Sequence, residues 1–98
     1  MIYVIGAPGN GVVKIGVSNN PRHRVEQLRN PRHARAPGSI DRSALMVMHA
    51  QPGDFALERA VHRYFAHRKV LGEWFDLGPV AVALVSSVIR EIKRERDK

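Results

Sequence analysis

Side chains capable of acid–base, anion-binding or metal-binding chemistry occur at several places in the sequence. Tyr3 and Lys14 fall in two β-branched runs, IYVIG and VVKIGV. Arg24 borders the apolar stripe of a predicted helix, where its planar guanidinium could bind two anionic oxygens at once. Glu73 stands between a glycine and two aromatic residues in GEWFDLG, and a lone carboxylate can hold Mg²⁺ when water and a substrate phosphate complete the coordination. Taken singly, each residue also has an ordinary structural explanation: a half-buried tyrosine, a lysine stem on apolar surface, a solvated arginine and a turn glutamate.

Glu58 and His62 are a further candidate pair, one turn apart on a predicted helix. They could ligate a metal, but a pair at this spacing is more often an ordinary helix-surface contact. Because only these two ligand types are present, the pair does not by itself predict a zinc site.

The charge of the chain indicates an anionic partner. The 98 residues carry a formal net charge of +7, and nucleic acid is the commonest anion bound by basic proteins. The positive charge is clustered in one stretch that contains a single acid, Glu26. We therefore expect DNA as the partner, with RNA left open. The residues expected to contact it are Arg22, His23, Arg29, Arg32 and Arg35, with Arg24 and His33 in the same stretch.

The composition bounds the size and surroundings of the protein. A chain of 98 residues, 44% of them hydrophobic, predicts one domain with a modest core. The absence of cysteine excludes disulfides and thiolate metal sites and fits a reducing compartment. No apolar run approaches the roughly 20 residues of a membrane helix, and the N-terminus lacks the basic region of a signal peptide. We therefore expect a cytoplasmic protein without a membrane partner.

The elements that must position the candidate residues begin with a β-hairpin. IYVIG and VVKIGV flank the segment APGNG, which is typical of a hairpin turn. The turn could centre on residues 8–9 or on residues 10–11, which would place Lys14 or Ser18 opposite Tyr3. Because side chains alternate along a strand, both registers place the same residues together. Tyr3, Lys14 and Gly16 share one face, and Ile2, Val4, Val13, Ile15 and Val17 share the more apolar face.

The rest of the chain alternates between helices and one strand. Capping side chains before Pro21 predict a helix from Pro21 to about Arg29, with Val25 and Leu28 toward the core. A loop over residues 30–41 leads to a third strand at 43–49.

Two more helices are expected near the C-terminus. Asp54 can cap a helix at 55–68, and a final helix over about 79–96 continues into the charged tail KRERDK. The order strand-strand-helix-strand-helix-helix predicts a small α/β (α+β) fold with a mostly antiparallel three-stranded sheet flanked by helices.

Five segments, taken in order, resemble the motifs of the GIY-YIG nuclease superfamily: IYV, KIG, NPRHR, ERAVHRYF and GEWF. The closest resemblance is to its small phage and bacterial branch, which carries KIG in place of YIG and a late GEWF. The resemblance covers about residues 2–77 and implies a single nuclease domain over 1–98. It implies a metal-dependent endonuclease that hydrolyses DNA phosphodiester bonds at a single Mg²⁺ or Mn²⁺.

The same resemblance implies a role for each candidate residue. Glu73 would bind the metal beside the scissile phosphate, and Arg24 would hold the phosphate oxygens. Tyr3 would orient or deprotonate the nucleophilic water, with its pKa lowered by Lys14 on the same face. His62 would assist proton transfer. Hydrolysis needs these functions because charge develops on the phosphate and on the leaving oxygen.

The sequence also departs from the family pattern. Met1 replaces the glycine of the first motif, Lys14 replaces the second tyrosine, and no asparagine follows Asn30, so the family's late asparagine is missing. Without the usual DNA-reading attachment, the protein would dimerise, use a partner that supplies specificity, or cut with little sequence preference. An alternative is a catalytically idle nucleic-acid-binding module on the same fold. A third hypothesis is an interaction factor whose charge targets an acidic protein.

Overall fold

The computed structural model describes residues 1–97, and in them five strands form one antiparallel sheet in the order β3-β1-β2-β5-β4. The predicted α+β class is confirmed, but the predicted count of three strands was wrong. The two additional strands, β4 and β5, have three residues each, too short to show the alternation that marks a strand in sequence. The strands are β1 (Ile2–Gly6), β2 (Val12–Val17), β3 (Met46–Gln51), β4 (Lys69–Leu71) and β5 (Trp74–Asp76).

The first two helices begin where capping residues were expected. The first helix, α1 (Pro21–Arg29), has the predicted bounds. The side chain of Asn20 caps it by accepting a hydrogen bond from the amide of His23 in the first turn of the helix. The second, α2 (Phe55–Tyr64), is capped by the Asp54 carboxylate. The third is α3 (Ala81–Arg96), and Lys98 of the predicted charged tail lies outside the described residues. Within residues 1–97, no helix is long and apolar enough to cross a membrane.

Two predicted boundaries were wrong because short 3-10 turns redirect the chain. The second helix ends at Tyr64 rather than at residue 68, and a 3-10 turn at Ala66–Arg68 leads directly into β4. The third strand begins at Met46 rather than at residue 43. There the carboxylate of Asp41 accepts the Ser43 amide (3.1 Å) and favours a 3-10 turn before the strand.

The β1–β2 hairpin decides which side chains share a face. The amide of Asn10 donates to the carbonyl of Ala7 (3.1 Å), so the turn centres on residues 8–9, as one alternative predicted. Neither expected register is correct, because Tyr3 lies opposite Gly16 and not opposite Lys14 or Ser18. The connection between the two strands is longer than a two-residue turn at 8–9 would make it. The displacement from either register is even, so every side chain keeps its predicted face.

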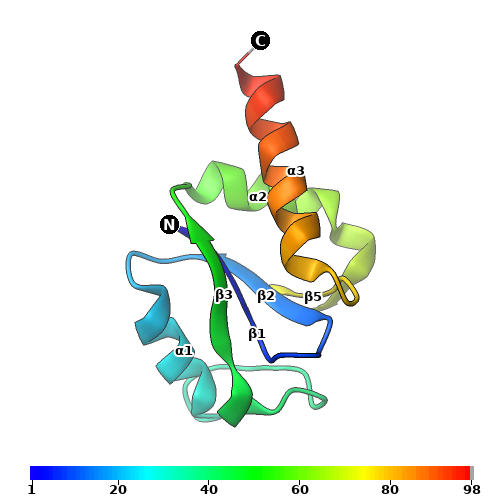
Figure 1. The fold of residues 1–98 in the computed structure, drawn as a ribbon. Helices are drawn as coiled ribbons and strands as arrows, with labels where there is room; N and C mark the ends of the chain where they lie inside the picture. Colours follow the sequence, from blue (N-terminus) through cyan, green and yellow to red (C-terminus); the bar gives the residue numbers. More distant parts are fainter. Residues whose placement is uncertain (98) are drawn as a thin grey trace.

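Two apolar cores lie on opposite faces of the sheet. In Figure 1, α2 and α3 lie together on one side and α1 on the other. The first face contributes Ile2, Val4, Val13 and Ile15 to the core under α2 and α3. The second face packs against α1 and the 30–41 loop, and its buried residues are Tyr3, Ile5, Val25, Leu28, Ile40, Leu45 and Trp74.

Candidate functional site

The candidate site lies at the edge of the sheet where the pairing of β2 with β5 stops, at the first residue of β5. The last pair between these strands is Lys14 with Trp74, and the amide of Ile15 then donates to the carbonyl of Glu73 (3.0 Å). In the described part of the chain, the β2 residues beyond Ile15 have no strand partner on this side. Side chains can therefore reach this edge from both faces of the sheet.

Glu73 sits in the tight turn between β4 and β5. The preceding Gly72 has φ +52, a backbone conformation that glycine adopts at little cost. The Lys14 ammonium donates to the Glu73 carboxylate at 2.6 Å, and the two side chains are 11% and 34% exposed. A charge-assisted hydrogen bond of this length holds the Glu73 carboxylate in place at this edge of the sheet.

Tyr3 is fully buried, and its hydroxyl points toward α1. The Nε of Arg24 donates to the Tyr3 hydroxyl at 3.4 Å. Burial raises the pKa of Tyr3 above its ordinary value of 10.0, and Arg24 only partly offsets this effect. The expectation that Lys14 lowers this pKa was wrong, because the ammonium pairs with Glu73 and the loss of water around the phenol dominates.

Gly16 makes room for the Tyr3 ring. A Cβ atom at Gly16 would lie 2.5 Å from the Tyr3 hydroxyl oxygen and 2.7 Å from its Cζ. Both distances are far shorter than van der Waals contact, so a larger residue would displace the ring. The glycine of KIG therefore positions the tyrosine of the preceding strand.

Helix α2 supplies two side chains to the same edge from the opposite face. The Nε2 of His62 lies 2.8 Å from the carbonyl of Ile15. The pKa of Glu58 is raised because the carboxyl loses water on burial and because Glu73 is a like charge nearby, although His62, Lys14 and a hydrogen bond from the Val17 amide each lower the pKa in part. The α2 side chains thus pair with backbone groups of β2 that β5 leaves free.

Three of these side chains can hold a metal ion. Glu58, His62 and Glu73 each offer a ligand atom, and the three atoms lie within 4.8 Å of one another. Carboxylate oxygen and imidazole nitrogen are ordinary ligands for divalent cations. The donor set fits a divalent metal ion and is larger than the single glutamate expected.

A cleft of about 400 Å³ opens beside this edge. Its walls include Lys14, Arg24 and Glu73, together with His33 and Arg35 from the 30–41 loop. These side chains come from four separate segments, so the fold alone brings them together.

The 30–41 loop is held in place by two hydrogen-bond donors. The indole N–H of Trp74 donates to the carbonyl of Arg35 (3.2 Å). The guanidinium of Arg42 donates to the carbonyls of Leu28 (2.7 Å) and Ala34 (2.8 Å). Arg42 was missed by the sequence reasoning, and no spacing or motif marks it, because its partners are backbone carbonyls.

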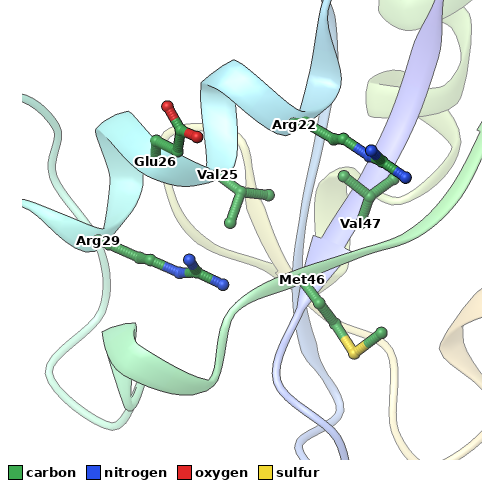
Figure 2. Close-up of a pocket in the computed structure, with 6 residues that line it drawn as sticks. All are labelled: Arg22, Val25, Glu26, Arg29, Met46 and Val47. Atoms are coloured by element: carbon green, nitrogen blue, oxygen red, sulfur yellow. The ribbon is translucent and has the colours of Figure 1, made fainter.

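The other basic residues lie elsewhere. Figure 2 shows Arg22 and Arg29 on α1 beside a second hollow, of about 360 Å³, between α1 and the start of β3. Arg29 donates to the carbonyl of Leu45 (3.0 Å), which gives it a structural role. His23 and Arg32 are exposed. The structure thus brings the five predicted catalytic residues to one edge. Of the predicted DNA-contacting residues, only Arg35 lines the cleft, whereas Arg22 and Arg29 lie beside the second hollow.

Fold and site together describe a small α+β domain with a polar cleft at a sheet edge. The chain belongs to the T5orf172 domain family, whose model matches residues 1–93. This is a phage-associated domain related to GIY-YIG and HNH-like nuclease folds, and it suggests a nuclease-like or DNA-binding function. No curated protein and no solved structure matches the chain.

Proposed function

We propose that this protein is a metal-dependent DNA endonuclease of the GIY-YIG type, which hydrolyses phosphodiester bonds in the cleft at the β2–β5 edge. The observation that carries the proposal is the convergence of four side chains from four segments: Tyr3, Lys14, Arg24 and Glu73. Family membership supports it, because the T5orf172 domain is related to nuclease folds.

Arg24 is suited to bind the phosphate. It lines the cleft while its Nε contacts the Tyr3 hydroxyl (3.4 Å), so its position is fixed on one side and open to a ligand on the other. A guanidinium can donate to two phosphate oxygens and stabilise charge that develops on them. This matches the role that the resemblance implies.

The Tyr3 hydroxyl lies behind Arg24, and the residue is 0% exposed in the free protein. It is suited to orient a water molecule that enters with the substrate rather than to deprotonate it. Its raised pKa keeps the phenol protonated near neutral pH. A protonated hydroxyl can accept a hydrogen bond from a water while it holds its own proton. The proton of the water must then leave through another group or to solvent.

Lys14 and Glu73 complete the arrangement. The ammonium holds one carboxylate oxygen of Glu73 at 2.6 Å, which leaves the second oxygen for a metal ion. A bound Mg²⁺ or Mn²⁺ supplies stabilisation of charge on the phosphate and on the leaving oxygen.

The test is plasmid nicking with Mg²⁺ or Mn²⁺, with the Glu73→Gln variant beside the wild type and a gel shift on the same samples. We expect metal-dependent nicking that is lost in Glu73→Gln while DNA binding persists. Glu91→Gln is a matched control, because Glu91 lies on α3 and pairs with Arg94 there. Unchanged cleavage by Glu73→Gln would refute the assignment of this carboxylate.

A second candidate is a catalytically idle nucleic-acid-binding module on the same fold. The observation that favours it is the Lys14–Glu73 ion pair itself, since the ammonium already compensates the carboxylate expected to bind the metal. This module would bind DNA more weakly as salt rises, because phosphate contacts release counterions. It would give no product with any metal.

A further inference from the structure

The α2 side of the site has a geometry that proton transfer does not explain. His62 and Glu58 are one turn apart on α2 and point toward the β2 edge, where their ligand atoms lie within 4.8 Å of a ligand atom of Glu73. The sequence placed only Glu73 at the metal and gave His62 a role in proton transfer.

The hydrogen bond of His62 fixes which ring nitrogen is free. Because Nε2 lies 2.8 Å from the Ile15 carbonyl oxygen, and a carbonyl can only accept, Nε2 must carry the proton. The lone pair is then on Nδ1. Histidines that ligate metals commonly donate their other N–H to a backbone carbonyl, which fixes both the tautomer and the orientation of the ring.

The two carboxylates have one positive partner between them. Lys14 forms an ion pair with Glu73 at 2.6 Å, whereas Glu58 forms no ion pair among residues 1–97. Two like charges this close disfavour each other's ionised form. A divalent cation bound between the two carboxylates would compensate both negative charges and remove the repulsion.

We infer that Glu58, His62 and Glu73 together form a three-ligand site for a divalent transition-metal ion. The inference deepens the proposed function, because it makes the metal centre larger than one glutamate and assigns His62 to the metal. Lys14 then acts as a positioning residue that holds one oxygen of Glu73 and leaves the other for the ion.

The ligand set selects the class of metal. Mg²⁺ prefers oxygen ligands and keeps several of its waters, so it gains little from an imidazole. Divalent transition metals such as Mn²⁺ accept nitrogen and oxygen together, and their affinity for such sites rises along the Irving–Williams order. The site should therefore prefer Mn²⁺ to Mg²⁺, and the preference should depend on His62.

The experiment is a metal titration of the full chain without DNA. Calorimetry and the loss of the free Mn²⁺ electron paramagnetic resonance signal would each measure binding. We expect one Mn²⁺ per chain, bound at least about tenfold more tightly than Mg²⁺. Glu58→Gln and Glu73→Gln should each weaken Mn²⁺ binding by about 10–100-fold or more. His62→Gln should weaken Mn²⁺ binding similarly and change Mg²⁺ binding much less.

Matched controls separate the site from general loss of charge. Glu91→Gln and His67→Gln, on exposed parts of α3 and of the turn after α2, should bind Mn²⁺ as the wild type does. Melting curves in a chelator show whether each variant folds. If His62→Gln unfolds because it loses the bond to Ile15, Glu58→Gln decides the question alone.

The outcomes distinguish this inference from the proposed function. Wild-type Mn²⁺ affinity in both α2 variants, with binding lost only in Glu73→Gln, would overturn the three-ligand site and leave a single-glutamate nuclease possible. Wild-type chain that binds neither metal would also overturn it. Mn²⁺ binding that depends on all three residues, without any DNA nicking, would support the site and refute the nuclease.

Discussion

Replacing Gly16 with alanine tests whether this glycine positions Tyr3. The new Cβ would lie 2.5 Å from the hydroxyl oxygen and 2.7 Å from Cζ of a ring that is 0% exposed. The ring would have to retreat by about 1 Å into a filled core, and overpacking of this kind costs about 1–3 kcal/mol. For a domain of this size, each kcal/mol lowers the melting temperature by about 4–8 °C.

The same change should impair cleavage beyond its effect on stability. A displacement of about 1 Å in a group that orients a reactant can cost about 100-fold in rate. We therefore expect Gly16→Ala to nick plasmid about 100-fold more slowly at temperatures where it is fully folded. Gly38→Ala is the matched control, because a Cβ there meets nothing within 4 Å.

A double-mutant cycle ties the effect to the tyrosine. Tyr3→Phe removes the hydroxyl oxygen, which is the atom nearest to the new methyl group. The two changes should therefore not be additive, with a coupling energy above about 0.5 kcal/mol. Equal melting temperatures for Gly16→Ala and Gly38→Ala would show that the ring has room to move and would refute the reasoning.

Three further predictions concern the stability and activity of the same cleft. Trp74→Ala should destabilise the fold by about 3–5 kcal/mol, because the ring is 1% exposed; an unchanged melting temperature would contradict this. Arg24→Ala should reduce cleavage more than DNA binding, because Arg24 is one of many basic residues that can contact DNA. A large loss of binding in the gel shift, with unchanged cleavage per bound complex, would contradict this prediction. Burial raises the pKa of Tyr3 above an unfolded value near 10.0, so stability should fall as pH rises from about 10 toward the folded pKa. Denaturant titrations at rising pH would measure the free energy of unfolding of the wild type and of Tyr3→Phe. The variant should lose less stability above pH 10 than the wild type, because it lacks the ionisable hydroxyl.

The sequence determined the features that depend on local chemistry. Pro21 and the capping side chain of Asn20 set the start of α1, and the Asp54 carboxylate set the start of α2. The alternation of the first two strands placed Tyr3 and Lys14 on one face even though the register was wrong, because any even shift preserves the faces. Motif resemblance then supplied the candidate residues, which the fold places at one edge.

Only the tertiary structure decided how the site is assembled. Strand β5 forms because it pairs with β2, and β4 forms because it pairs with β5. A run of three residues does not show such pairing in the sequence. Glu58 meets Glu73 because β5 begins only at Trp74 and leaves the edge of β2 beyond Ile15 open to α2. Lys14 pairs with Glu73 rather than acting on Tyr3, because the turn places the carboxylate within 2.6 Å of the ammonium. Contacts between residues far apart in the chain depend on where strands end, and strand ends are fixed by pairing partners rather than by local sequence.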